Sequence, residues 1–326
     1  ESALHFERRT RLTKLYNIQL AAVTTLLVVI IGSVTGIVAA SMVLLEERAH
    51  KAIAELTTLV MGVAPHAGRL WSGFAVYVGL SLALVLGSSL LALSSPTVPG
   101  SGLPALKAYL NGVQPDHEWA SWRILVAKTL GITAVVSTGI PLGKEGPMVH
   151  IGSMIGAQIS RLRVFGLERF LELRLPRAQR EWVGMGAAAG VAAAFNAPLG
   201  GILYSFEEVC SSWSAELTWR SFVCNVVVSM TLAFCIHYTS LEGEGFVNSL
   251  TVGGLGGAPH PPVTSSHVVW IILLALFGGL VGALYNIGVT RMVQLRARLH
   301  GDRPLRQVAE AGVLCLIAFA VYFFVP

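Results

Sequence analysis

Three short segments rich in glycine and proline hold the residues of this 326-residue chain whose types and spacing suit ion chemistry. The segments cover Pro99–Pro104, Gly143–Ser153 and Ala194–Leu203. Within a membrane, a broken helix is tolerated only where its freed backbone groups are buried in protein or line a cavity. The three segments therefore predict a site built from backbone N–H groups and a few polar side chains, as in a transporter or channel.

Glu145 is the most informative of these side chains, because it stands at a Gly-flanked turn, Gly143–Pro147, that opens a short helix. The first turn of a helix has unpaired N–H groups and a positive dipole end, which attract an anion. An ionised Glu145 would occupy that site, and a protonated or displaced Glu145 would vacate it for a small anion. The alternative is that Glu145 caps the helix and pairs with Lys144. An acid at the membrane centre costs roughly 2.5–3.5 kcal/mol and is usually functional. This favours the interpretation in which Glu145 occupies and vacates an anion site.

Three further polar residues have both a functional and a structural interpretation. Ser101, between two glycines, leaves nearby backbone N–H groups accessible, as in an anion-binding nest, although Gly-Ser-Gly is also a common turn. Glu208, which follows Glu207 at the end of a Gly/Ala-rich segment, is either a proton entrance or a solvated helix end. His150 is predicted to be packed or hydrogen-bonded, because no second His or Cys lies at metal-ligand spacing. We expect no metal and no cofactor.

The composition excludes two large classes of protein. Hydrophobic residues make up 54% of the chain and charged residues 13%. A soluble domain carries roughly 25% charged residues, and a disordered chain has high charge and few apolar residues. A multi-pass membrane protein surrounded by lipid remains. The net charge of +5 is then a topology signal, and no nucleic-acid partner is expected.

The elements that must position these residues are apolar helices of unequal length. A spanning helix needs about 20 apolar residues. Arg123 and Lys128 weaken one apolar run, and Met148–Ser160 is too short to span. Runs of such unequal length indicate a transporter or channel rather than a simple bundle. The expected helical runs are Leu20–Leu45, Leu70–Leu93, Trp119–Leu142, Met148–Ser160, Trp182–Phe206, Phe222–Tyr238, His267–Thr290 and Ala311–Pro326.

Basic residues indicate the orientation of the chain. They gather before the first run, between residues 161 and 180, and between residues 291 and 306. The stretch Ile236–Ser266 has no Lys or Arg, and the expected loop Glu46–Arg69 is balanced in charge. The positive-inside rule puts the basic regions and the N-terminus in the cytoplasm, and the other two loops outside or in a lumen.

Two mid-span segments resemble each other, Ile31–Gly36 and Phe277–Gly282, and by the charge rule their spans run in opposite directions. Opposed orientation is typical of an inverted repeat. A GxxxG pattern on its own is common in membrane helices and indicates close packing. Both interpretations stay open at the level of these residues.

Taken together, the segments Gly100–Pro104, Gly143–Pro147 and Asn196–Gly201 resemble three signature segments of the CLC chloride channels and proton-coupled chloride transporters, in order and spacing. Lys107–Gly112 is similar to eukaryotic members, and the resemblance covers essentially the whole chain. It implies an all-α polytopic membrane protein with a CLC-like inverted repeat of tilted, broken helices. Only the first repeat and the start of the second would be present.

The resemblance also implies roles for individual residues. The Ser101 hydroxyl would bind a central chloride, Glu145 would be the gating glutamate, and Glu208 would be the proton-side glutamate of exchangers. Pure channels of the family commonly carry an apolar residue at the position of Glu208, so its presence favours exchange. The anion-binding residues that the resemblance implies are Ser101, Gly102, Leu103, Lys144, Glu145 and Gly146.

The sequence departs from the family pattern in two ways. Ala105 replaces the acidic or amide residue that usually follows the signature proline. The Gly-x-Phe-x-Pro motif and the late tyrosine of the second half are not found, so we expect a piece of a longer protein that holds half of the anion pathway. The expected parts are a cytoplasmic N-terminal segment (1–18), a first repeat (19–240), an extracytoplasmic loop (241–266) and the start of a second repeat (267–326).

Four functional hypotheses follow. The first is exchange of chloride for protons, and the second is a gated chloride channel. The third is an intramembrane serine hydrolase, which would need Ser101 and His150 at hydrogen-bond distance and an oxyanion hole. The fourth is a structural subunit without transport activity. The resemblance implies a homodimer with contacts through Gly184–Phe206 and Phe222–Tyr238, where Gly186 and Gly190 permit close packing.

Overall fold

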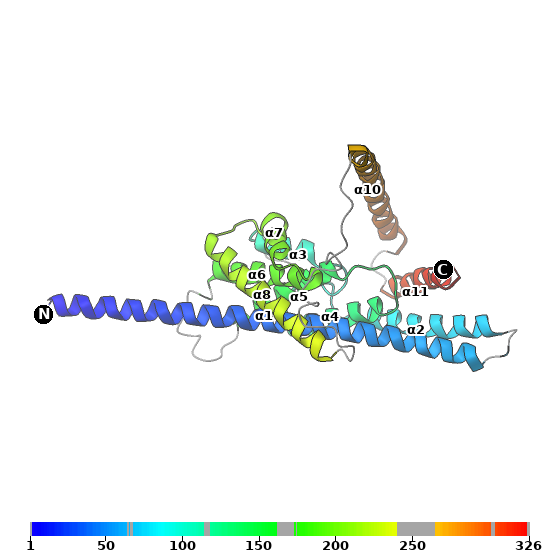
Figure 1. Ribbon diagram of the computed structural model, residues 1–326, viewed down its shortest axis with the longest axis horizontal. Helices are drawn as coiled ribbons and strands as arrows, with labels where there is room; N and C mark the ends of the chain where they lie inside the picture. Colours follow the sequence, from blue (N-terminus) through cyan, green and yellow to red (C-terminus); the bar gives the residue numbers. More distant parts are fainter. Residues whose placement is uncertain are drawn as a thin grey trace.

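The computed structural model describes residues 2–63, 65, 68–113, 118–161, 173, 175–239, 265–300 and 304–324, and within them it has helices and no strand (Figure 1). The elements are α1 (Ser2–Val63), α2 (Arg69–Ala92), α3 (Leu103–Leu110), α4 (Trp122–Val136), α5 (Glu145–Arg161), α6 (Pro176–Phe195), α7 (Pro198–Tyr204), the π-helical turn η3 (Ser205–Val209), α8 (Ala215–Thr239), α10 (Ser265–His300) and α11 (Pro304–Phe324). Five of them are long and apolar enough to cross a membrane, namely α1, α2, α8, α10 and α11. The predicted all-α polytopic membrane fold is confirmed.

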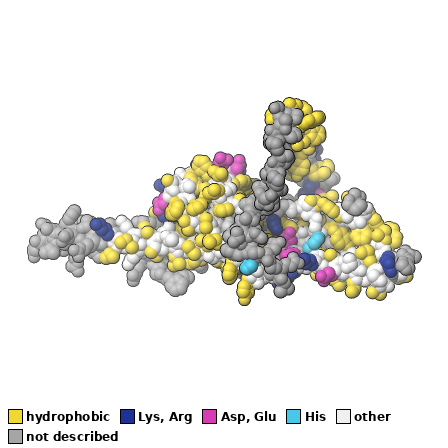
Figure 2. All heavy atoms as spheres, in the orientation of Figure 1, with side chains coloured by type: hydrophobic (Ala, Val, Ile, Leu, Met, Phe, Trp, Pro, Cys, Tyr) yellow, Lys and Arg dark blue, Asp and Glu magenta, His cyan; other side chains and the backbone are white. Residues whose placement is uncertain are grey.

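Hydrophobic side chains cover much of the visible described surface (Figure 2). Charged side chains gather in a few places on it, which suits a surface that contacts lipid over most of its area. Most of the loop expected at 241–266 lies outside the described residues, because α10 begins at Ser265.

The first helix is much longer than the sequence predicts. The run Leu20–Leu45 lies inside α1, but the helix continues to Val63 through the stretch expected to be a loop. No Gly or Pro occurs between Val38 and Met61, and Ile53 is buried against the rest of the chain. The loop prediction for Glu46–Arg69 is therefore wrong for most of its length, because charged residues at a helix surface were taken for a loop.

Glycines bring α5 and α6 into backbone contact at the centre of the fold. Gly152 and Gly156 of α5 face Gly186 and Gly190 of α6, and a Cβ on any of the four would collide with backbone atoms of the facing helix. Close packing at Gly186 and Gly190 was expected, and it occurs within the chain. The segment Gly184–Ala193 is buried throughout, so it cannot contact a symmetry mate directly.

A second glycine contact fixes the crossing of α1 and α8. A Cβ on Gly32 would lie 2.7 Å from Cys224 O, and one on Gly36 would lie 3.0 Å from Val228 O. The first GxxxG segment is thus a packing surface. A Cβ on Gly278 or Gly282 of α10 would meet no described atom of another element within 4 Å, and α10 rises away from the other helices (Figure 1). The inverted repeat stays a prediction for this pair of segments.

The long Gly/Ala-rich run breaks where Asn and Pro predict that it should. Helix α6 ends at Asn196, which has φ 49° in the left-handed region, and α7 begins at Pro198. The side-chain amide of Asn225 on α8 donates to Pro198 O at 2.8 Å. A buried amide therefore satisfies a backbone carbonyl at the break, as a membrane environment requires.

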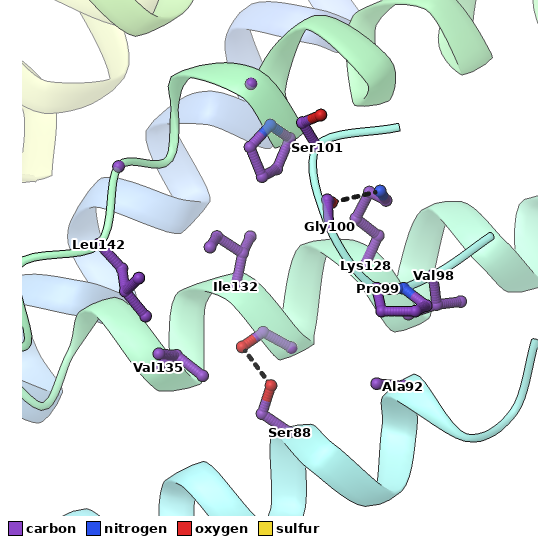
Figure 3. Close-up of a pocket in the computed structure, with 14 residues that line it drawn as sticks. Ser88, Ala92, Val98, Pro99, Gly100, Ser101, Lys128, Ile132, Val135 and Leu142 are labelled. Carbon is purple, nitrogen blue, oxygen red and sulfur yellow. Dashed lines mark hydrogen bonds between the residues drawn. The ribbon is translucent and has the colours of Figure 1, made fainter. Parts of the chain in front are cut away.

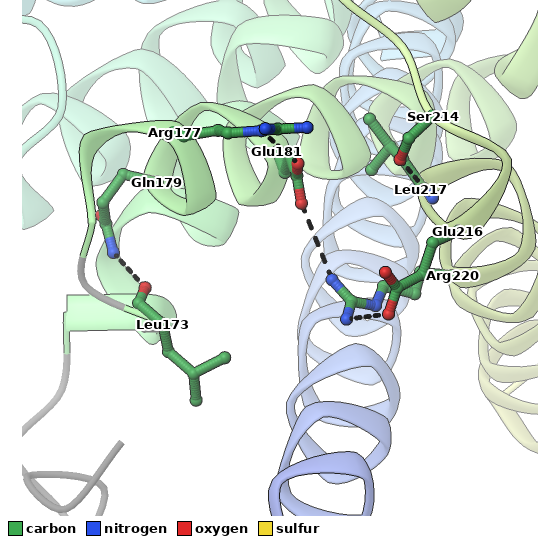
Figure 4. Close-up of polar contacts among 8 residues, drawn as sticks. All are labelled: Leu173, Arg177, Gln179, Glu181, Ser214, Glu216, Leu217 and Arg220. Carbon is green, nitrogen blue, oxygen red and sulfur yellow. Dashed lines mark hydrogen bonds and ion pairs between the residues drawn. The ribbon is translucent and has the colours of Figure 1, made fainter. Parts of the chain in front are cut away.

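A charged network joins the starts of α6 and α8 (Figure 4). Glu181 on α6 lies 3.6 Å from Arg177 and 3.7 Å from Arg220, and Arg220 also pairs with Glu216. The Arg220 guanidinium also lies 5.8 Å from the centre of the Trp182 ring. These contacts anchor α8 beside α6 at one end of the fold.

Candidate functional site

The first two signature segments meet at one pocket. The pocket has a volume of about 440 Å³ and lies between α2, α4, the loop Val98–Ser101 and the turn Leu142–Pro147 (Figure 3). The Ser88 hydroxyl of α2 donates to Gly131 O of α4 at 2.9 Å, which holds these two walls together. Ser101 and Gly146, which are 45 positions apart in the sequence, thus line one pocket.

Direct contact between Ser101 and Gly146 places two helix N-termini side by side. A Cβ on Gly146 would lie 2.9 Å from Ser101 Cβ. Helix α3 starts just after Gly102, which has φ 75°, and α5 starts at Glu145. The positive ends of both helix dipoles therefore face the same small region, an arrangement that favours an anion.

The donors that these N-termini offer follow from the hydrogen bonds already made. Ser101 Oγ accepts from the Leu103 N–H at 3.4 Å, so its own hydroxyl proton is left to donate. In α5, Lys144 O accepts from the Met148 N–H at 2.9 Å. Pro147 has no N–H. The first turn of α5 thus offers the N–H groups of Glu145 and Gly146.

Lys128 is a site residue that the sequence analysis missed. It is 2% exposed, and its ammonium donates to Gly100 O at 3.0 Å, directly before Ser101 (Figure 3). Among the described residues, no carboxylate lies within 4.0 Å of this ammonium. A buried cation without a carboxylate partner makes the pocket electropositive. The signal was present, since a lysine inside an apolar run is a functional candidate by default.

Glu145 and Lys144 do not pair with each other in the way that the capping alternative requires. The Lys144 ammonium lies 2.7 Å from Glu46 Oε2 on α1. The Glu145 carboxylate folds back over Gly143, where a Cβ would collide with Glu145 Oε2. Glu145 is half-buried at the first position of α5. The alternative in which Glu145 pairs with Lys144 is therefore wrong, because the tertiary fold supplies another acid, Glu46.

His150 is a packed histidine, as the sequence predicts. Its Nε2 lies 3.2 Å from Trp119 O, its ring is stacked on Trp119, and the ring contacts Gly102. Its Nδ1 has no hydrogen-bond partner among the described residues. Ser101 and His150 therefore make no hydrogen bond, and the hydrolase hypothesis is wrong on geometry.

Glu208 lies apart from the anion pocket. It sits on η3 and its Oε2 is 3.3 Å from the ammonium of Lys107 on α3, with side chains 59% and 41% exposed. Lys107 was not singled out from the sequence, because nothing local connects it with an acid 101 positions away. Helix α3 starts beside Ser101 and carries Lys107 in its last turn, so it links the pocket with Glu208.

Comparison with known proteins gives the family. Residues 79–326 match the family described as voltage gated chloride channel. The mouse (Mus musculus) protein named H(+)/Cl(-) exchange transporter 7 is 35% identical over 266 residues, which cover 78% of this chain and 32% of that protein. Chloride channel protein D of Dictyostelium discoideum is 36% identical over 265 residues, 79% of this chain and 26% of that protein. Chloride channel protein CLC-a of Arabidopsis thaliana is 33% identical over 309 residues, 91% and 38% respectively.

Two solved structures resemble the fold. A slow cyanobacterial Cl⁻/H⁺ antiporter superposes with a TM-score of 0.72 at 23% identity, over 93% of this chain and 64% of that one. A eukaryotic CLC transporter superposes with a TM-score of 0.65 at 28% identity, over 91% of this chain and 49% of that one. At 23% identity, the similarity to the cyanobacterial antiporter supports a shared fold and nothing beyond it.

The fold and the pocket define a polytopic helical membrane protein in which two helix N-termini converge beside a pocket. The chain belongs to the CLC family of voltage gated chloride channels. It spans about a third of the length of the curated relatives that it matches.

Proposed function

We propose that the chain is part of a membrane transporter that exchanges chloride for protons, with chloride as bound substrate and no cofactor. The observation that carries the proposal is the pocket where the N-termini of α3 and α5 meet beside the buried ammonium of Lys128. Its relatives are named as ion exchangers and channels rather than enzymes. The exchanger name of the mouse relative supports the choice of chloride and protons.

In the proposed mechanism, a chloride ion accepts hydrogen bonds from the Ser101 hydroxyl and from the N–H groups at Lys144–Gly146, with the backbone of Gly102 and Leu103 completing the inner side. An ionised Glu145 carboxylate competes with chloride for the donors at the start of α5. A protonated Glu145 leaves them free, because a neutral acid is held less strongly at a positive helix end. One side chain thus carries a proton and gates the anion.

Glu208 serves only the proton path in this mechanism. It is exposed and separate from the pocket, so it exchanges protons with water without blocking chloride. Its carboxylate is held beside the ammonium of Lys107 on α3, which fixes its position near the end of that helix. With the N-terminus and the basic segments in the cytoplasm, Glu208 would take up protons from that side.

We also propose a homodimer, formed by a smaller surface than the two segments named from the sequence. The Gly184–Ala193 part is excluded by its burial in the chain. The remainder carries exposed apolar side chains, which suit an interface or a lipid contact. These side chains are Phe195, Leu199, Leu203, Phe206, Met230, Phe234 and Tyr238.

The test is chloride-driven proton uptake measured together with chloride flux, in liposomes that contain the protein at its full natural length. Glu145→Gln should abolish proton uptake and leave chloride flux ungated. Glu208→Gln should abolish proton uptake and leave gating by Glu145 in place. Glu207→Gln is the matched control, since Glu207 is an exposed acid of the same turn, and it should keep full coupling. Coupling that survives Glu208→Gln would refute the proton path.

The second candidate is a gated chloride channel, which the name of the Dictyostelium relative favours. The same experiment separates the two functions. Chloride flux in the unmodified protein without any proton movement would establish the channel and refute exchange.

A further inference from the structure

Two residues of α1, one helical turn apart, hold both ends of the linker that precedes the gating glutamate. His50 Nδ1 lies 3.3 Å from Ser137 O, at the end of α4. Glu46 Oε2 lies 2.7 Å from the Lys144 ammonium, at the start of α5. A single face of α1 therefore braces the linker Ser137–Lys144 against the rest of the fold.

The Glu46–Lys144 pair is better placed than an ordinary surface ion pair. Each of its side chains is 27% exposed. The neighbouring pair on the same helix, Glu47–Lys51, has side chains that are 53% and 61% exposed. Exposed pairs contribute little and are screened by salt, whereas partly buried pairs are screened less. Glu46 thus neutralises the Lys144 ammonium at a defined position.

That position matters because Lys144 directly precedes Glu145. The Glu145 carboxylate is folded over Gly143 on the other side of Lys144 in the sequence. Glu46, from α1, binds the ammonium of Lys144, although Glu145 is the acid next to Lys144 in the sequence. Without Glu46, the ammonium would carry an uncompensated charge at the start of α5.

We propose that Glu46 is a positioning residue of the gate: it binds the Lys144 ammonium and keeps that cation away from Glu145 and from the mouth of the anion pathway. Glu46 thereby sets how strongly chloride is attracted to the site formed by the start of α5. The expected effect on chloride transport rests on the proposed function. The positioning of the Lys144 ammonium rests on the ion pair with Glu46 alone.

The kinetic test compares two neighbouring acids. Glu46→Gln should lower the KM for chloride by about two- to tenfold, because a freed unit charge lies close to the anion site. The kcat should change less, since the charge acts on binding. Glu47→Gln changes the net charge equally but removes only the exposed ion pair with Lys51, so its KM should match that of the unmodified protein. In the double variant Glu46→Gln/Lys144→Met, the KM should equal that of Lys144→Met alone.

Equal KM shifts in Glu46→Gln and Glu47→Gln would mean a general charge effect and would overturn the proposal. No shift in either would overturn it as well. A KM shift that persists after Lys144→Met would show that Glu46 acts on another group, with the same consequence.

A second measurement does not depend on transport. The folded protein in detergent is treated with a water-soluble N-hydroxysuccinimide ester of acetic acid, and mass spectrometry follows the acetylation of Lys144. The acetylation rate should rise in Glu46→Gln and stay constant in Glu47→Gln. Identical rates in the two variants would refute the positioning role. If the unmodified protein moved no chloride, the proposed function would fail, and the acetylation rates would still decide this inference.

Discussion

The contact between Gly102 and His150 supports a sharp prediction, because Gly100 provides a control with nearly the same φ angle. Gly100 has φ 72° and Gly102 has φ 75°, so alanine at either position is strained by the left-handed conformation. A Cβ on Gly100 meets no atom within 4 Å. A Cβ on Gly102 collides with the His150 ring, which is fully buried and held by Trp119 O.

The two substitutions should therefore differ by the cost of the collision alone. The left-handed conformation costs an L-residue about 1–2 kcal/mol, and the loss of glycine freedom in the unfolded chain offsets about 0.4–1 kcal/mol of it. Gly100→Ala should lower the free energy of unfolding by about 1 kcal/mol. Overpacking a rigid ring adds about 1–3 kcal/mol, so Gly102→Ala should lower it by about 2–4 kcal/mol.

The assay is unfolding by sodium dodecyl sulfate in mixed micelles, followed by far-UV circular dichroism and tryptophan fluorescence. The double variant Gly102→Ala/His150→Ala supplies a further check. Against the His150→Ala background, Gly102→Ala should cost only the backbone strain, which gives a coupling energy of about 1–3 kcal/mol. Equal losses of stability in Gly100→Ala and Gly102→Ala, or a coupling energy near zero, would refute the packing argument.

Three other predictions follow from the same pocket and its supports. Gly143→Ala should force the flexible Glu145 carboxylate to move, which should alter chloride flux while the free energy of unfolding changes by about 0.5 kcal/mol or less. An unchanged chloride flux would contradict this. In a Glu145→Ala background, Gly143→Ala should leave the chloride flux unchanged. In Gly152→Ala, the new Cβ meets backbone atoms of α6 that cannot yield, so the free energy of unfolding should fall by about 3 kcal/mol. In the control Gly79→Ala on α2, the Cβ meets nothing, and the free energy of unfolding should rise by about 0.5–1 kcal/mol. Similar changes in the two variants would be inconsistent with the α5–α6 contact. Lys128→Met should weaken chloride binding about three- to thirtyfold in isothermal titration calorimetry, because the buried charge beside Gly100 is lost. An unaltered affinity would show that Lys128 does not contribute to chloride binding.

Features that depend on a few neighbouring residues were predictable from the sequence. The run Leu70–Leu93 corresponds to α2, Arg69–Ala92, because an uninterrupted apolar run of that length has one favourable structure in lipid. The break at Asn196 was predictable for a similar reason, since proline two positions later cannot continue a helix. The turn before Glu145 and its free N–H groups follow from Gly143 and Pro147 in the same way.

The partners of the charged residues were decided by the tertiary structure. The sequence offers Lys144 an adjacent acid, yet the fold brings Glu46 to 2.7 Å from its ammonium across 98 positions. Lys128 reaches Gly100 O only because α4 packs beside the loop before α3. A local pattern specifies whether a segment is helical and where it ends, because those energies arise within one or two turns. Which charge meets which depends on how helices cross, and here glycine contacts such as Gly152 with Gly186 set those crossings.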